Sequence, residues 1–156
     1  MKLAAGVIMY RMRNGAPEIL LVHPGGPQNV NNDLGWWSIP KGLADNGEEG
    51  DALLDVAKRE FEEETGFKPE GQLVYVGSVL NGARDKTVHA WMMEGDADVL
   101  KLKSNTCMFE WPPRSGKQIE IPEVDRGEFF DLETAKNKIH DYQLGLIEQF
   151  ERKLGV

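Results

Sequence analysis

The segment from Asp51 to Thr65 is the clearest helix in this chain of 156 residues, and it constrains how the remainder can fold. Its apolar side chains recur at helical spacing and form one stripe: Leu53, Leu54, Ala57 and Phe61. Gly66 follows as a C-terminal stop. On the same helical wheel, three carboxylates fall within roughly 100° of arc beside this stripe: Glu60, Glu63 and Glu64. We therefore expect these glutamates to flank the core, whereas Glu62 points the other way.

A group of glutamates at this place is unfavourable for the helix alone. Like charges three and four residues apart repel, and the helix dipole disfavours each negative charge in the last turns by about 0.3 to 1 kcal/mol. A solvated acidic face is the common explanation for such a run, but selection for stability alone would place Lys or Arg there. A hard divalent cation takes oxygen ligands and removes both penalties. The pattern therefore favours a metal site.

Short β-capable runs surround this helix. Residues 4–12 and 18–23, joined by the turn dipeptide Asn14-Gly15, predict a β-hairpin. The other expected elements are a strand-like segment at 36–39, strands at 73–80, 87–93 and 127–130, and one or two helices over 131–154. Residues 23–33 read as a long loop, and residues 104–123 resist a regular assignment. This order predicts a single domain over residues 1–156, of the α+β (α/β) class with a mixed sheet.

Charge and cysteine content narrow the partners and the compartment. Eighteen Lys and Arg against 26 Asp and Glu leave a net charge of −8, the wrong sign for holding a nucleic-acid polymer. The single cysteine, Cys107, excludes an internal disulfide and a cysteine-based zinc site, which favours a reducing, cytoplasmic location. No apolar run approaches the roughly 20 residues that span a bilayer, so no membrane partner is expected.

The loop and helix together carry a motif. This motif consists of Gly42, Glu48 and the run REFEEETGF from Arg59 to Phe67. It resembles the Nudix box, written G-x5-E-x7-R-E-U-x-E-E-x-G-U, over about residues 42–67. The second half matches at every specified position. Ten residues instead of seven separate Glu48 from Arg59, so either Glu48 or Asp51 is the expected partner of Arg59.

The resemblance implies an α/β/α sandwich and hydrolysis of a diphosphate linkage in a nucleoside diphosphate joined to another group X. It assigns Mg²⁺, or Mn²⁺, to Glu60, Glu63 and Glu64 with the backbone carbonyl of Lys41, and one glutamate also helps to deprotonate the attacking water. It gives structural roles to Gly42, Glu48, Arg59 and Gly66.

Nudix enzymes often add a carboxylate from outside the box. Glu123 is our first choice for this catalytic role and Glu120 the second, with an exposed loop acid as the plain alternative. For substrate binding we select the ammonium of Lys41, Arg84 or else Lys86 at a hairpin tip, and Trp37. Because Trp36 and Trp37 are adjacent, one should enter the core while the other is free to stack on a base.

The sequence thus predicts a metal-dependent pyrophosphohydrolase acting on a small nucleoside polyphosphate or dinucleoside polyphosphate. The alternative is a non-catalytic Nudix-like module that binds a nucleotide as a sensor. A damaged box would mark such a module, and here all three glutamates are present. Relatives that dimerise make a homodimer the expected assembly if the chain is not monomeric.

Overall fold

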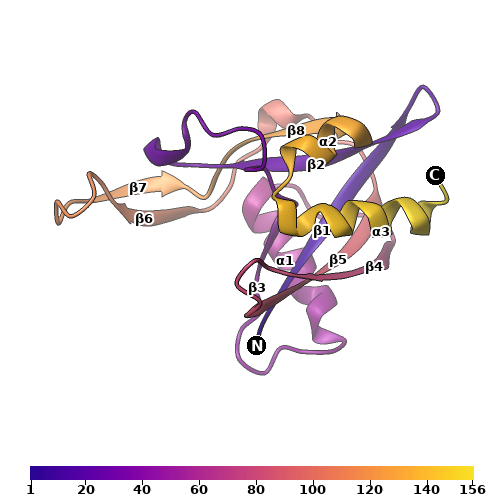
Figure 1. The fold of residues 1–156 in the computed structure, drawn as a ribbon, viewed down its shortest axis with the longest axis horizontal. Helices are drawn as coiled ribbons and strands as arrows, with labels where there is room; N and C mark the ends of the chain where they lie inside the picture. The colour runs from indigo at the N-terminus through magenta and orange to yellow at the C-terminus, as the bar shows by residue number, and fades with distance from the viewer.

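A computed structural model describes residues 1–156 and shows a mixed sheet with helices on both faces (Figure 1). The strands of this sheet are β1 (Lys2–Arg13), β2 (Ala16–Pro24), β3 (Lys41–Leu43), β4 (Leu73–Leu80), β5 (Lys86–Glu94) and β8 (Val124–Asp131). Their order is β4-β5-β1-β2-β8, with β3 paired to the first half of β1. Only β1 and β5 run parallel; the other pairs are antiparallel. The mixed sheet expected from the sequence is therefore confirmed.

Three α-helices cover the sheet. They are α1 (Ala52–Thr65), α2 (Leu132–Lys138) and α3 (Leu144–Leu154), with short 3₁₀ turns η1 (Pro27–Asn29), η2 (Val99–Lys101) and η3 (Asp141–Gln143) between elements. The C-terminal region thus holds two helices separated by η3. No helix of the structure is long and apolar enough to cross a membrane.

The hydrophobic core has two halves, one on each face of the sheet. Strand β1 contributes to both because successive side chains point to opposite faces. Ile8 packs with the buried side chains of α3 on one face, and Val7 packs with Phe61 of α1 on the other. This central strand therefore fixes α1 relative to the C-terminal helices.

Helix α1 behaves as its sequence predicts. Leu53, Ala57 and Phe61 are buried against the sheet, and Val56 takes the inward place that we gave to Leu54, which is half-buried. Gly66 ends the helix in the left-handed conformation, with φ 78°, and its N–H donates to the Glu62 carbonyl at 2.8 Å. A glycine is favoured there because side chains with a Cβ are strained at positive φ.

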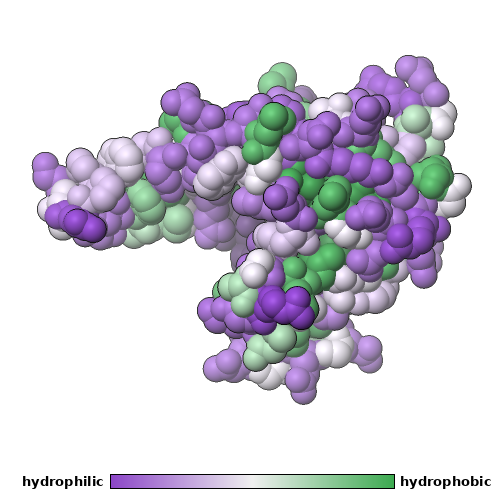
Figure 2. Space-filling view, viewed as in Figure 1, coloured by the Kyte–Doolittle hydropathy of each residue, from purple (hydrophilic) through white to green (hydrophobic).

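Residues 104–123 differ from the sequence-based expectation. They form a hairpin of β6 (Thr106–Glu110) and β7 (Gln118–Pro122), a two-stranded sheet separate from the main one. Figures 1 and 2 show this hairpin, which we call the arm, projecting beyond the body of the molecule with hydrophilic side chains at its tip. The prolines and glycine of its turn, Pro112, Pro113 and Gly116, obscured the alternation of polar and apolar residues in the flanking strands.

The strand-like segment at 36–39 was also predicted wrongly. Only Trp37 and Ser38 make isolated bridges, to Ile139 and to Val22 respectively. The segment instead lies between the end of α2, β2 and β3. The N–H of Trp37 donates to the carbonyl of Lys138 at the end of α2, and Ser38 exchanges backbone hydrogen bonds with Val22 of β2.

We expect Gly66→Ala to lower the free energy of unfolding by about 1 to 3 kcal/mol, because φ is positive and the site is crowded. A Cβ there would lie 2.8 Å from the carbonyl oxygen of Lys103. Gly155→Ala is a matched control, since Gly155 ends α3 at φ 84° with open space around it. Urea unfolding should show a larger loss for Gly66→Ala; equal losses would contradict the close packing after α1.

Candidate active site

The last two turns of α1 present the predicted arc of glutamates. Glu60, Glu63 and Glu64 are half-buried, whereas Glu62 is exposed on the opposite side. The backbone N–H of Lys41, on β3, donates to Oε1 of Glu64 at 3.2 Å. The helical-wheel projection of the sequence therefore predicted correctly which carboxylates lie against the core and which one faces water.

Burial and the charges of neighbouring acids disfavour the charged forms of Glu60 and Glu64. Burial raises the pKa of Glu64 to about 8, against the lowering effect of Lys41. Burial, followed by the charge of Glu63, raises the pKa of Glu60 to about 7. Without a cation, the cluster therefore tends to retain protons near neutral pH.

Glu123 belongs to this cluster, although it is distant in sequence. It lies at the root of the arm, where its N–H donates to the carbonyl of Asn105 at 2.9 Å, and the N–H of Asn105 donates to the carbonyl of Glu63 at 2.7 Å. The residue is exposed, but partial burial of its carboxyl group and the charge of Glu63 raise its pKa. Glu120, in contrast, lies on β7 opposite Met108, out on the arm.

Arg59 is paired with Glu48 and not with Asp51. Its two terminal nitrogens donate to the two carboxylate oxygens of Glu48 at 3.1 and 3.2 Å, and the N–H of Asp45 donates to the same carboxylate at 2.7 Å. The three additional residues are accommodated before α1, where Gly47 and Gly50 have φ 87° and 60°. The pair therefore ties the longer loop to the middle of the helix.

Lys41 and Gly42 bring β3 against the glutamates. A Cβ at Gly42 would collide with the carboxylate of Glu60, so glycine leaves room for that carboxylate. The charge of Lys41 favours ionisation of Glu64 and disfavours protonation of His140, whose pKa is lowered mainly by burial. The ammonium of Lys41 therefore acts on the acidic cluster and on the neighbouring surface around His140.

The donor set fits a hard divalent cation. It consists of carboxylate oxygens whose repulsion and burial a cation would offset, and oxygen ligands are those that Mg²⁺ prefers. As they stand, no three His, Cys, Asp or Glu side chains are placed to hold an ion. Binding therefore requires the glutamate side chains to rotate toward one another.

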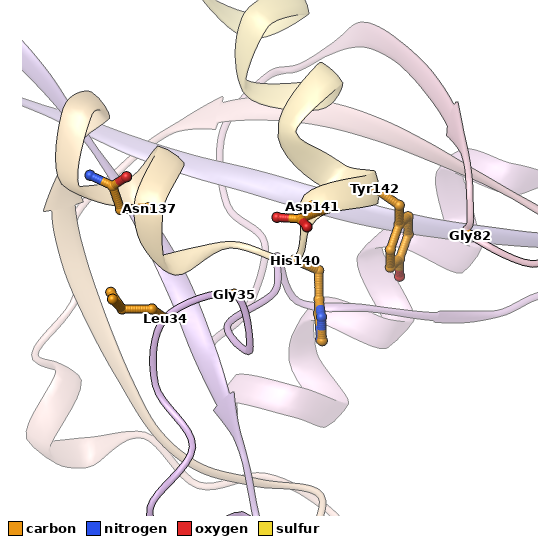
Figure 3. A pocket seen from close by; sticks show the side chains of 7 residues that line it. All are labelled: Leu34, Gly35, Gly82, Asn137, His140, Asp141 and Tyr142. Atoms are coloured by element: carbon orange, nitrogen blue, oxygen red, sulfur yellow. The ribbon is translucent and has the colours of Figure 1, made fainter.

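A pocket of about 550 Å³ lies on the surface near His140 (Figure 3). It is lined by residues from three separate segments: Leu34, Gly35, Gly82, Asn137, His140, Asp141 and Tyr142. The rings of His140 and Tyr142 are stacked with centroids 5.8 Å apart, and the ring of Trp36 lies 6.0 Å from that of His140. The Nζ of Lys86 lies 6.0 Å from the centre of the Tyr142 ring. This combination of aromatic faces and a cation suits a base with attached phosphates.

Sequence reasoning did not select His140 and Tyr142. The only signal was two aromatic residues in the short break between the C-terminal helices, and that signal says nothing about Leu34 or Gly82. The pocket forms because the fold brings three distant loops together.

One substrate-binding assignment from the sequence needs correction, and the assignment of Arg84 stays a prediction. Trp37 cannot stack on a base, because it is only 2% exposed and its Nε1 donates to Asp33 at 2.8 Å; Trp36 is the exposed member of the pair, at 44%. Arg84 lies exposed in the turn between β4 and β5 and does not line the pocket, to which this turn contributes Gly82. Lys86, the alternative to Arg84, approaches Tyr142.

The chain is thus a mixed-sheet domain with helices on both faces, and it carries an acidic helix beside a glycine-containing loop. The family model described as NUDIX domain matches residues 1–150, so the chain belongs to this family. The chain is similar to the structure of C. elegans Ap4A hydrolase in a binary complex, with 25% identity and a TM-score of 0.66. The match covers 99% of this chain and 98% of that one.

Two further structures share the fold. The Nudix domain of Shewanella oneidensis NrtR complexed with ADP ribose is 18% identical, with a TM-score of 0.64 over 97% of this chain and 87% of that one. A MutT protein from Methanosarcina mazei Go1 is 19% identical, with a TM-score of 0.61 over 99% of this chain and 96% of that one. No curated protein matches the chain.

We expect Glu64→Gln to stabilise the metal-free protein, and increasingly so as the pH rises. The ordinary carboxyl pKa of 4.5 is raised to about 8 in the folded state, so between these values the folded state binds more protons than the unfolded chain. Wild-type stability therefore falls through this window as pH rises, and the amide removes that slope. Urea unfolding in EDTA at several pH values measures it. Glu62→Gln, on the exposed side, should run parallel to wild type; a parallel Glu64→Gln curve would contradict the expectation.

Proposed function

We propose that this protein hydrolyses a diphosphate linkage in a nucleoside or dinucleoside polyphosphate, and that the reaction depends on Mg²⁺ or Mn²⁺. The single observation that carries the proposal is the cluster of half-buried Glu60, Glu63 and Glu64 beside the loop of Lys41, with the exposed Glu123 at its edge. Repulsion within this cluster is relieved by a divalent cation, and the phosphates of such a substrate supply the complementary charge.

The metal would be held by Glu60, Glu63 and Glu64, with the carbonyl of Lys41. When bound, it neutralises the diphosphate and lowers the pKa of a water for in-line attack on phosphorus. Glu123, with its raised pKa at the edge of the cluster, is suited to accept the proton of that water. The Lys41 ammonium is suited to pair with a phosphate oxygen, and it lies between the acidic cluster and the pocket.

The pocket supports a nucleoside as one part of the substrate. His140 and Tyr142 offer ring faces for a base, while Lys86 and Lys41 are available for phosphates leading to the cluster. Similarity to an Ap4A hydrolase over nearly the whole of both chains supports a dinucleoside polyphosphate within this class. The alternative is nucleotide binding without turnover, as a sensor; the complete set of box glutamates favours the enzyme.

Location and assembly remain sequence-based predictions. The single cysteine supports a reducing cytoplasm, and the net charge of −8 supports small phosphorylated ligands over nucleic acid. A homodimer is the assembly expected from relatives of this kind.

The reaction is tested with a panel of nucleoside triphosphates, dinucleoside polyphosphates and nucleotide sugars, in Mg²⁺ or in EDTA. We expect turnover of at least one substrate only with metal, and Glu64→Gln and Glu123→Gln should each reduce it by about 100-fold or more. Glu62→Gln is the matched control and should retain wild-type rates. A folded protein that binds nucleotide and metal but turns over nothing would establish the sensor instead.

The nucleoside pocket generates a separate prediction. Tyr142→Ala removes a ring face and should raise KM for the best substrate by about tenfold, because base stacking contributes about 1 to 3 kcal/mol. Tyr75→Ala is a suitable control, since Tyr75 is an exposed tyrosine on β4 that does not line the pocket. An unchanged KM for Tyr142→Ala would show that the base binds elsewhere.

A further inference from the structure

Three polar side chains belong to the buried core: His23, Thr65 and Gln143. Thr65 donates to a carbonyl of its own helix, and His23 bonds to Asp125 and to the carbonyl of Asn32. Of these three, Gln143 is the side chain that connects the two parts of the candidate site, and the mechanism described above does not use it.

Every polar atom of the Gln143 side chain is engaged. Its Oε1 accepts a hydrogen bond from the N–H of Ile39 at 3.1 Å. Its Nε2 donates to Oγ of Ser38 at 2.9 Å and to the hydroxyl of Tyr142 at 3.0 Å. The side chain is 0% exposed, so bulk water does not reach these groups. Removal of the amide would therefore leave buried groups unpaired, which is costly.

These partners lie on the two sides of the site. Ser38 and Ile39 begin the segment that leads through Pro40 to Lys41, whose N–H donates to the Glu64 carboxylate. Tyr142 lines the pocket proposed to hold the nucleoside. The amide of Gln143 thus bonds the hydroxyl of Tyr142, whose ring would contact the base, and also the loop whose backbone N–H at Lys41 bonds Glu64.

Gln143 is not needed to hold the backbone of this region together. The N–H of His140 donates to the carbonyl of Trp37 at 2.9 Å, and the N–H of Trp37 donates to the carbonyl of Lys138 at 3.0 Å. These bonds attach the loop to the C-terminal segment without the glutamine. The amide adds a link from the Tyr142 side chain to Ser38 and Ile39, which lie closer to Lys41 in the sequence than Trp37 does.

We propose that Gln143 is a positioning residue that couples the nucleoside pocket to the Lys41 loop, so that a base seated against Tyr142 fixes the placement of Lys41 against Glu64. This inference rests on the proposed function. It implies that the nucleoside contributes to turnover as well as to binding, because it orders the loop on which the chemistry depends.

The test is Gln143→Met, which keeps length and apolar packing but removes all the hydrogen bonds. We expect kcat at saturating substrate to fall about tenfold, as for the loss of buried hydrogen bonds. Binding of the nucleoside monophosphate product, measured calorimetrically without metal, should stay within about threefold, because the stacked rings remain in place. A purely structural role would weaken both or neither.

The chain offers a matched control in Gln149, on α3. Its Oε1 accepts from the N–H of Ser78 at 3.2 Å and its Nε2 donates to the carbonyl of Ser78 at 3.1 Å, away from the pocket and the acidic cluster. Gln149→Met should lower the melting temperature and leave kcat unchanged. If Gln143→Met does not fold, Ser38→Ala removes one partner and should reduce kcat about threefold with product binding unchanged.

The outcomes separate this inference from the proposed function. Equal kcat for an active wild type and Gln143→Met, or parallel losses of kcat and product binding, would overturn the coupling alone. A wild type that turns over no member of the panel would overturn the proposed function and the coupling with it. A selective loss of kcat in Gln143→Met, absent in Gln149→Met, would establish the positioning role.

Discussion

Repulsion between half-buried carboxylates is the constraint around which the rest of this structure is arranged. Glu60 and Glu64 lie in the last turns of α1, where neither the helix dipole nor their neighbours favour negative charge. Their raised pKa values express that conflict. The fold keeps them together because Phe61, between them in sequence, is fully buried and anchors this part of the helix to the sheet. Burial of Phe61 thus stabilises the helix against the sheet, whereas the charges of Glu60 and Glu64 beside it are unfavourable.

The two faces of the sheet divide the work of the site. The α1 face supplies the acidic cluster, and its geometry is held by the Arg59–Glu48 pair and by the close approach of β3 at Gly42. The C-terminal segment supplies the aromatic pocket. The loop from Trp36 to Lys41 passes from one region to the other, which explains why it forms bridges and side-chain hydrogen bonds in place of a strand.

The sequence predicted features that depend on residues close together in the chain, and it missed features that depend on distant ones. The arc of α1 and its stop at Gly66 could be inferred from helical geometry, and a family pattern suggested Glu123 before Glu120 as the acid near the cluster. The partner of Arg59 could not, because Glu48 and Asp51 were both within reach and only the path of the loop distinguishes them. The pocket at Tyr142 depends on contacts between residues more than 100 positions apart in the chain, which no local pattern records. The misassignment of Trp37 arose in the same way, since its burial is decided by Phe130 and His23.

The arm has a consequence for how the protein responds to heat. A two-stranded hairpin outside the main sheet is marginally stable by itself, so β6 and β7 can separate while the two-sided core remains folded. Glu123 lies immediately after β7, and its backbone bonds to Asn105 and Gly25 form the root of this hairpin. Opening that reaches the root would release one acid of the cluster without unfolding the domain. Loss of activity on warming would then precede loss of the fold, and the arm would set the upper temperature at which the protein works.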